Sequence, residues 1–196
     1  MKERGLLLSK DLRDKSRSGE KTQTRRLIKG NPSDRHGRLD FKQGILKQSS
    51  LIGGCWNVGK TFKPQYQVGD HLYLQEPYTV IETNTDHASH VWIRLKYKDD
   101  DTESGWMRQP AILTHKLAAR TWFEVTDVRV ERLQDISEED AKAEGTSPEN
   151  AEVNIMGKGA YVNGFFDLWD STSNIKWAEN PWVFVYTYKG ITKEQN

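Results

Sequence analysis

The hydrophobic positions of this chain occur in short runs, and polar stretches separate these runs. The runs predict β-strands at residues 6–8, 72–74, 91–97, 121–133 and 182–188. β-Branched and aromatic side chains, which suit a pleated surface, are frequent in them. Asp127 and Arg129 interrupt the apolar alternation of residues 121–133, which predicts a strand that is paired along both edges.

Three segments have the signals of short helices. Residues 10–18 are almost entirely polar and end before Gly19, a typical helix stop. Residues 138–145 follow Ser137 as an N-cap, and residues 161–169 place apolar side chains on one face. Short helices between irregularly spaced strands predict an α+β fold, built around a small, mostly antiparallel sheet or barrel.

A long stretch between the first predicted helix and the next strands lacks periodicity. Residues 30–66 are rich in Gly, Ser, Asn, Lys and Pro, and they predict a basic, loop-rich insertion. The whole chain, 1–196, has the length of one domain. We therefore expect a single domain that carries this insertion.

Composition narrows the class of protein. No apolar run approaches the ~20 residues that span a bilayer, and the first residues lack the apolar core of a signal peptide. One cysteine, Cys55, excludes an internal disulfide. These features predict a cytoplasmic protein that does not enter a membrane.

The net charge of +1 conceals an asymmetry. Residues 1–66 contain 16 Lys and Arg against 6 Asp and Glu, whereas the remainder contains 13 against 22. A basic segment of this kind indicates an anionic partner such as nucleic acid. The acidic part of the chain could equally neutralise the basic part within the fold, and both interpretations stay open.

Three further patterns carry little chemistry. Residues 54–61 match the phosphate-loop pattern G-x-x-x-x-G-K-[ST], but Pro64 follows at once and leaves no room for the helix that such a loop requires. His87 and His90 have no third metal ligand nearby, and nothing pairs Cys55 with a base. We expect no metal and no cofactor.

The densest chemistry lies in residues 19–26, which combine an amine, two hydroxyls, an amide and two guanidiniums. Gly19 allows the chain to turn, so that Lys21 and Thr24 can share a pocket. In a buried site the neighbouring arginines would lower the pKa of Lys21 toward that of a base, and a hydroxyl beside a neutral amine is a potential nucleophile.

The alternative for this cluster is simple charge pairing. Lys21, Arg25 and Arg26 would then bind phosphates, or would pair with Glu76 and Glu144. Basic clusters are commoner as anion sites than as catalysts, so composition alone favours this alternative.

The motif Gly-x-Lys-Thr-x-Thr-x-Arg at residues 19–26 resembles the signature of ASCH-domain proteins, which have a PUA-like fold. Residues 68–70 with the strand and Glu76 after them, residues 124–136 and residues 180–183 are similar to a subgroup often carried by phages and prophages. The resemblance implies a small β-barrel with flanking short helices and a cleft lined by the Lys-Thr-x-Thr segment.

The resemblance also implies an activity. One small bacterial ASCH protein is an amidohydrolase that removes acetyl groups from N4-acetylcytidine and needs no metal. Its catalytic residues correspond to Lys21, Thr24 and Glu144. The residues expected to bind the modified cytosine nucleoside, or RNA, are Gln23, Arg25, Arg26 and Glu76.

Two other functions remain open. The basic segment 1–66 could make the protein a non-catalytic RNA- or DNA-binding module. Ribonuclease activity also occurs among ASCH relatives, and Lys21, Thr24 and His36 could serve it here.

Overall fold

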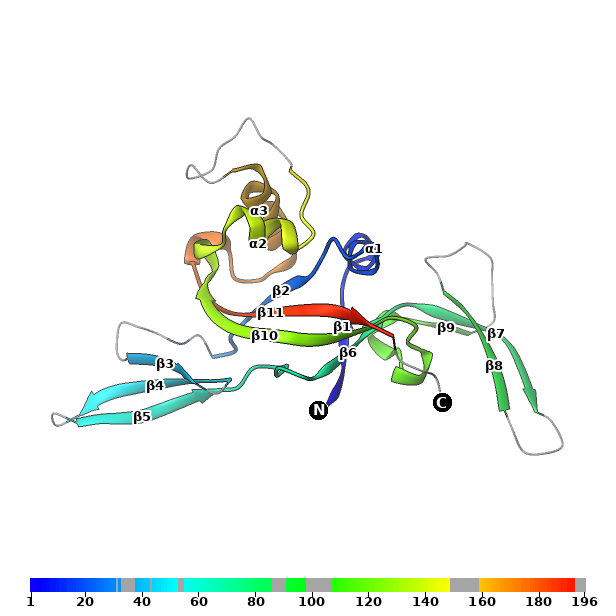
Figure 1. The fold of residues 1–196 in the computed structure, drawn as a ribbon, viewed down its shortest axis with the longest axis horizontal. Helices are drawn as coiled ribbons and strands as arrows, with labels where there is room; N and C mark the ends of the chain where they lie inside the picture. Colours follow the sequence, from blue (N-terminus) through cyan, green and yellow to red (C-terminus); the bar gives the residue numbers. More distant parts are fainter. Residues whose placement is uncertain are drawn as a thin grey trace.

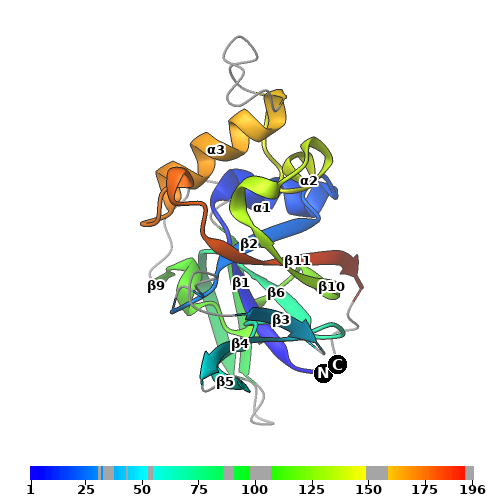
Figure 2. The ribbon, with the colours of Figure 1, turned by 90° about the vertical axis from the view of Figure 1, so that its left-hand side faces the viewer.

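A computed structural model describes residues 1–30, 32, 38–42, 44–52, 55–85, 91–97, 107–148 and 159–192. Its central sheet has five strands in the order β1-β6-β10-β11-β2 (Figures 1 and 2). These are β1 Glu3–Leu7, β2 Gln23–Leu27, β6 His71–Gln75, β10 Trp122–Arg132 and β11 Trp182–Ile191. β1 pairs with β6 in parallel, and the other pairings in this sheet are antiparallel.

The two edge strands of this sheet, β1 and β2, approach each other without pairing. Arg26 Nη2 on β2 donates a hydrogen bond to the Leu7 carbonyl on β1 at 3.0 Å. No ladder joins these strands, so the described strands form an open sheet rather than the closed barrel that we expected. The α+β class, the mostly antiparallel pairing and the short helices are confirmed.

β10 pairs on both edges, as predicted, with β11 and with β6. Its register against β11 shifts between Val125 and Asp127, so that one extra residue is inserted. The shift reverses the alternation, and Val128 therefore lies in the same apolar cluster as Val125. A regular strand would have placed Arg129 with Val125 on the core face. The bulge explains why the sequence pattern of this strand looked interrupted.

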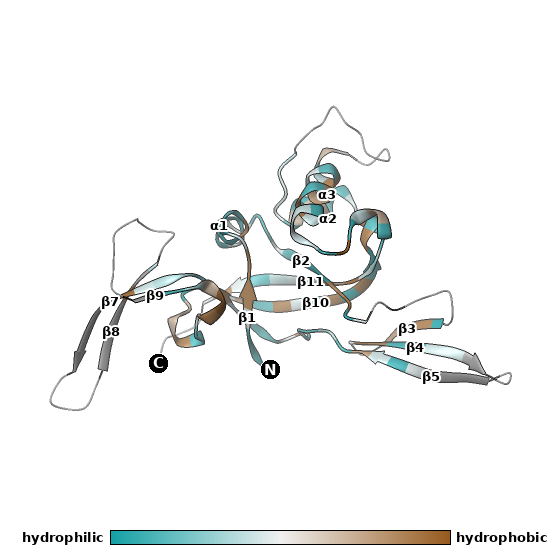
Figure 3. Ribbon diagram, turned by 180° about the vertical axis from the view of Figure 1, so that it is seen from behind, coloured by the Kyte–Doolittle hydropathy of each residue, from teal (hydrophilic) through white to brown (hydrophobic). Residues whose placement is uncertain are grey.

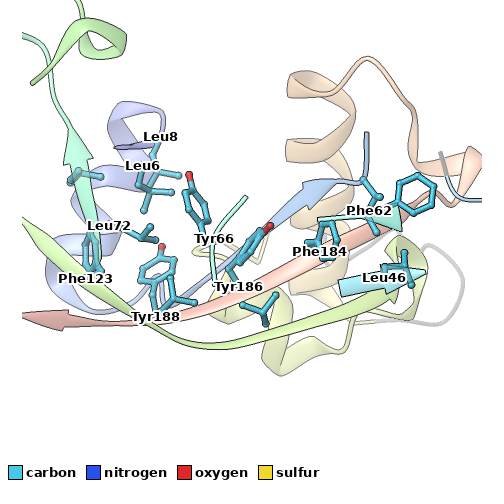
Figure 4. Packing of buried hydrophobic residues seen from close by; sticks show 14 residues of the cluster. Leu6, Leu8, Leu46, Phe62, Tyr66, Leu72, Phe123, Phe184, Tyr186 and Tyr188 are labelled. Atoms are coloured by element: carbon cyan, nitrogen blue, oxygen red, sulfur yellow. The ribbon is translucent and has the colours of Figure 1, made fainter. Parts of the chain in front are cut away.

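Two apolar clusters occupy the two faces of the sheet. One contains Leu6, Leu72, Tyr66 and Tyr186, with the rings of the two tyrosines 5.0 Å apart (Figure 4). The other cluster packs the helices against the sheet and includes Phe165. Adjacent residues of β11 alternate between the two clusters, as the period of a strand requires.

Three α-helices cover the sheet: α1 Lys10–Ser18, α2 Glu138–Ala143 and α3 Ala160–Thr172. The Ser137 hydroxyl accepts a hydrogen bond from the Asp140 backbone at 3.1 Å, so the predicted N-cap of α2 is confirmed. α1 is largely hydrophilic (Figure 3). It is anchored by polar contacts: Arg13 donates to the Leu8 carbonyl at 2.9 Å, and the hydroxyls of Ser16 and Tyr188 lie 3.3 Å apart.

Two small sheets extend from opposite ends of the central sheet (Figure 1). One contains β3 Arg38–Lys42, β4 Ile45–Ile52 and β5 Cys55–Phe62. The other contains β7 Tyr78–Thr85, β8 Val91–Tyr97 and β9 Met107–Gln109. In the described part of the chain, single-turn 3-10 helices lie at Ala111–Leu113, Lys116–Ala118, Leu133–Asp135 and Trp177–Glu179. None of the helices in the described ranges is long and apolar enough to cross a membrane.

The loop-rich character expected for residues 30–66 is wrong. Much of this segment is the antiparallel sheet β3-β4-β5, and Leu46 and Phe62 bury its base against the central core. Short strands with many Gly, Ser and Lys residues give too weak an alternation for sequence reasoning to detect. The phosphate-loop pattern falls largely within β5, an extended strand with no helix after it, which agrees with our rejection of that motif.

At Gly164, helix α3 packs closely against the backbone of residue 147. A Cβ at position 164 would clash with the Ser147 carbonyl. Gly164→Ala should therefore destabilise the protein by about 1–3 kcal/mol, although alanine is the better helix former. The midpoint of thermal unfolding should fall by about 2–4 °C for each kcal/mol.

Gly190→Ala is the matched control, because a Cβ at position 190 meets no atom within 4 Å. An unfolding midpoint that rises in Gly164→Ala would show that α3 does not pack against residue 147 in this way.

Candidate active site

A cavity of about 670 Å³ lies where β2 meets α1, α3 and the end of β1. Its polar wall includes Lys21, Thr24 and Glu144, and its apolar wall includes Phe165 and Trp169. The cavity therefore lies at the opening between the two edge strands of the central sheet. Its volume lies within the ~300–1,000 Å³ range of small-molecule sites.

The amine of Lys21 is buried in this wall, with 2% of the residue exposed. Lys21 Nζ donates to the Gln23 carbonyl and the Glu144 carbonyl, both at 2.7 Å, and to Glu144 Oε2 at 2.9 Å. Three acceptors match the three protons of an ammonium. Burial lowers the pKa of Lys21, while the Glu144 carboxylate acts in the opposite direction. The three acceptors suit a charged resting amine, and its lowered pKa means that it loses its proton more readily than an exposed lysine.

Two glycine turns bring Lys21 and Glu144 together. Gly19 ends α1 in the left-handed region at φ 84°, and the Lys21 backbone then donates to the Lys15 carbonyl at 2.9 Å. Gly145 follows Glu144 at φ 79°, and a Cβ there would lie 3.0 Å from the Lys21 Cβ. Only glycine combines this conformation with this close approach.

The Glu144 carboxylate is shared between two cations. Its Oε2 accepts from Lys21, and its Oε1 accepts from Arg25 Nη1 at 3.2 Å. Burial acts to raise the pKa of Glu144, but the charges of Lys21 and Arg25 outweigh it and hold this pKa below its usual value. Glu144 is therefore ionised in the resting site.

Arg25 connects the cavity to a second layer of charges. Its Nη2 donates to Asp140 Oδ2 at 2.8 Å and to Glu131 Oε2 at 3.1 Å. Its guanidinium carbon lies 5.8 Å from the centre of the Phe165 ring. These contacts fix the arginine that holds one oxygen of Glu144.

Asp140 is the centre of this second layer. Arg129 donates to Asp140 Oδ2 at 2.6 Å, and Gln23 Nε2 donates to Oδ1 at 2.9 Å. Arg129 Nε also donates to Glu131. Burial acts to raise the pKa of Asp140, but the Gln23 hydrogen bond and the charges of Arg25 and Arg129 outweigh it and lower that pKa. The bulge in β10 makes these contacts possible, because it turns Arg129 away from the core face.

Thr24 and Arg26 lie on the opposite face of β2 from Gln23 and Arg25, since side chains alternate along a strand. Thr24 is 4% exposed and lines the cavity. Its hydroxyl has no hydrogen-bond partner among the residues that the structure describes. A hydroxyl without a partner at a cavity wall is available to a bound molecule.

The structure brings most of the predicted site residues together. Lys21, Thr24, Glu144, Arg25 and Arg26 all line the one cavity. Gln23 lies behind the wall, where it holds Asp140.

Glu76 lies elsewhere and does not line this cavity. It is 1% exposed, pairs with Arg17 and accepts from Arg120 Nε at 3.0 Å. The predicted contact of Glu76 with a substrate has no support from this placement. His36, His87 and His90 lie outside the described residues.

Sequence reasoning missed the second layer of Asp140, Glu131 and Arg129, and the apolar wall of Phe165 and Trp169. The sequence did hint at Arg129, because this charged residue interrupts the apolar alternation of its strand. Across the described ranges, no group of three or more His, Cys, Asp and Glu side chains is placed to hold a metal ion.

Searches among protein-family models, curated proteins and solved structures each return no match to the chain. The resemblance to ASCH-domain proteins therefore stays a prediction from the motif residues of the sequence.

The lowered pKa of Asp140 predicts a dependence of stability on pH. Its paired, ionised form stabilises the fold above the usual aspartate pKa of ~4, and this contribution is lost as the pH falls through that value toward the lower pKa of the folded state. Asp140→Asn should therefore flatten the acid side of a plot of unfolding free energy against pH.

Asp127→Asn is the matched control on β10, because Asp127 is exposed and its nearest cation, Arg129 Nη1, lies 3.7 Å away. The control should lose stability at acid pH in the same way as the wild-type protein. If the unfolding free energies of wild type and Asp140→Asn fell in parallel as the pH is lowered, the role given to this carboxylate would be contradicted.

Proposed function

We propose that the protein is an amidohydrolase of the ASCH type, with a PUA-like open sheet, that deacylates N4-acylated cytosine nucleosides. One observation carries the proposal: the buried Lys21 amine contacts Glu144 in the wall of a cavity that also holds an unpartnered Thr24 hydroxyl. A base, an acid and a nucleophile are thus available in one small-molecule site.

The reaction begins with a proton shift between Lys21 and Glu144. Transfer from Nζ to Oε2 along their 2.9 Å hydrogen bond gives a neutral amine and a carboxylic acid. Burial favours this neutral pair, because it removes two charges from a poorly solvated site. A substrate that fills the cavity displaces water and increases this effect.

Acylation of Thr24 follows. The neutral Lys21 amine takes the proton of the Thr24 hydroxyl, whose oxygen attacks the acyl carbonyl of the substrate. As the C–N bond breaks, the Glu144 acid gives its proton to the departing exocyclic amine. The products of this step are cytidine, an acyl ester on Thr24 and the original Lys21–Glu144 ion pair.

Hydrolysis of the ester repeats the same proton movements. Lys21 again shifts a proton to Glu144 and accepts one from the attacking water. Glu144 protonates the Thr24 oxygen as the carboxylic acid leaves. The chain's own acid and base therefore supply every proton that the two steps require.

The walls of the cavity suit a nucleoside. Phe165 and Trp169 offer apolar surface for the base, and Arg26 offers hydrogen-bond donors for an oxygen-bearing group of the substrate. Arg25 and its carboxylate partners orient Glu144 rather than touch the reacting atoms.

The direct test is release of cytidine from N4-acetylcytidine, followed by chromatography. Lys21→Met should lower kcat/KM by about 100-fold or more, since it removes the base. Thr24→Val should abolish turnover, because it removes the nucleophile and keeps the shape of the side chain.

Thr22→Val is the matched control, since Thr22 belongs to the same motif but does not line the cavity. It should keep the wild-type rate. Unchanged turnover in Lys21→Met with wild-type unfolding behaviour would refute the proposed chemistry.

A further inference from the structure

Arg26 is a cation in the cavity wall with spare donors. Among the described residues its one hydrogen bond is from Nη2 to the Leu7 carbonyl at 3.0 Å, and its buried Nε has no partner there. No acidic side chain among the described residues pairs with it. A guanidinium has five N–H donors, so Arg26 retains most of its hydrogen-bonding capacity.

The other arginine of the cavity differs in this respect. Arg25 is neutralised by Glu144, Asp140 and Glu131, whereas no carboxylate in the described ranges pairs with Arg26. Because Glu144 also pairs with Lys21, the positive charge that the described carboxylates leave uncompensated in the cavity wall is that of Arg26. The cavity therefore carries a net positive charge that a neutral nucleoside would leave uncompensated.

We infer that the substrate of this site carries a phosphate, and that Arg26 binds it, so that the protein acts on an N4-acylated cytidine mononucleotide. This inference rests on the proposed function for the acyl group, but the phosphate site can be measured without catalysis. Arginine presents paired N–H groups that match two oxygens of one phosphate. With a volume of about 670 Å³, the cavity suits one nucleotide.

Arg26 and Thr24 are two residues apart on the same face of β2, next to each other along the cavity wall. A nucleotide bound with its phosphate at Arg26 would place the remainder of the molecule along this wall, toward Thr24. The single strand β2 thus supplies both the nucleophile and the phosphate contact.

The experiment compares the binding of CMP and cytidine by calorimetry. The wild-type protein should bind CMP roughly tenfold or more tightly than cytidine, as one charge-assisted contact provides. In Arg26→Gln the affinity for CMP relative to cytidine should approach one. Arg26→Lys should keep part of the preference for CMP, because lysine still supplies a positive charge. Higher salt should reduce the preference for CMP.

Arg4→Gln is the matched control. Arg4 also has a buried Nε without a partner, but it does not line the cavity. This variant should keep the wild-type ratio. Equal affinity of the wild type for CMP and cytidine, or a ratio that Arg26→Gln leaves unchanged, would overturn the inference. Tighter, Arg26-dependent binding of a cytidine-containing RNA oligonucleotide than of CMP would overturn the mononucleotide assignment.

Hydrolysis assays separate this inference from the proposed function. Arg26-dependent binding of CMP, without hydrolysis of N4-acetylcytidine or its 5′-phosphate, would support the phosphate site and refute the amidohydrolase. Hydrolysis of both substrates with equal kcat/KM would support the amidohydrolase and refute the phosphate site. Preferential hydrolysis of the phosphate that is lost in Arg26→Gln would support both.

Discussion

The burial of the Lys21 ammonium is the constraint on which the rest of the site depends. A buried charge without partners would cost several kcal/mol, and this one is compensated by Glu144 and two backbone carbonyls. Glu144 in turn requires Arg25, and Arg25 requires the acidic side chains of α2 and β10. Each charge therefore depends on the next, from Lys21 at the cavity to the acidic side chains of α2 and β10.

The backbone provides the places for these charges. The open side of the central sheet leaves β2 as an edge strand, and both faces of that strand contribute to the cavity wall. The bulge in β10 reverses the direction of its side chains, so that Arg129 meets Asp140 while Val128 stays in the core. Closing the sheet into a barrel would remove the opening in which the cavity lies.

Local signals predicted much of this arrangement. The N-cap at Ser137, the stop at Gly19 and the strand at residues 121–133 each depend on neighbouring residues, and the structure confirms them. The motif residues Lys21 and Thr24 were identified for the same reason. Glu144 was named as one possible ion-pair partner of the basic cluster, but its catalytic role came only from a resemblance, since its contact with Lys21 joins residues 123 positions apart.

Other features depended on contacts that no local pattern encodes. The second layer of Arg129 and Asp140 exists because a bulge and a helix meet across the sheet. Glu76 was expected at the site through the resemblance, but its partners are arginines of α1 and the segment before β10. The charges in the sequence did not show which cation would form an ion pair with each carboxylate.

The proposed chemistry depends on a lysine that gives up its proton readily while it is held by Glu144. NMR of protein labelled with ¹⁵N at the lysine side chains measures this directly, as the Nζ signal of Lys21, assigned with Lys21→Met, is followed against pH. The account predicts that Lys21 titrates below the ~10.4 of ordinary lysines, because desolvation disfavours its charged form. A Lys21 pKa at or above that of the exposed lysines would contradict the account.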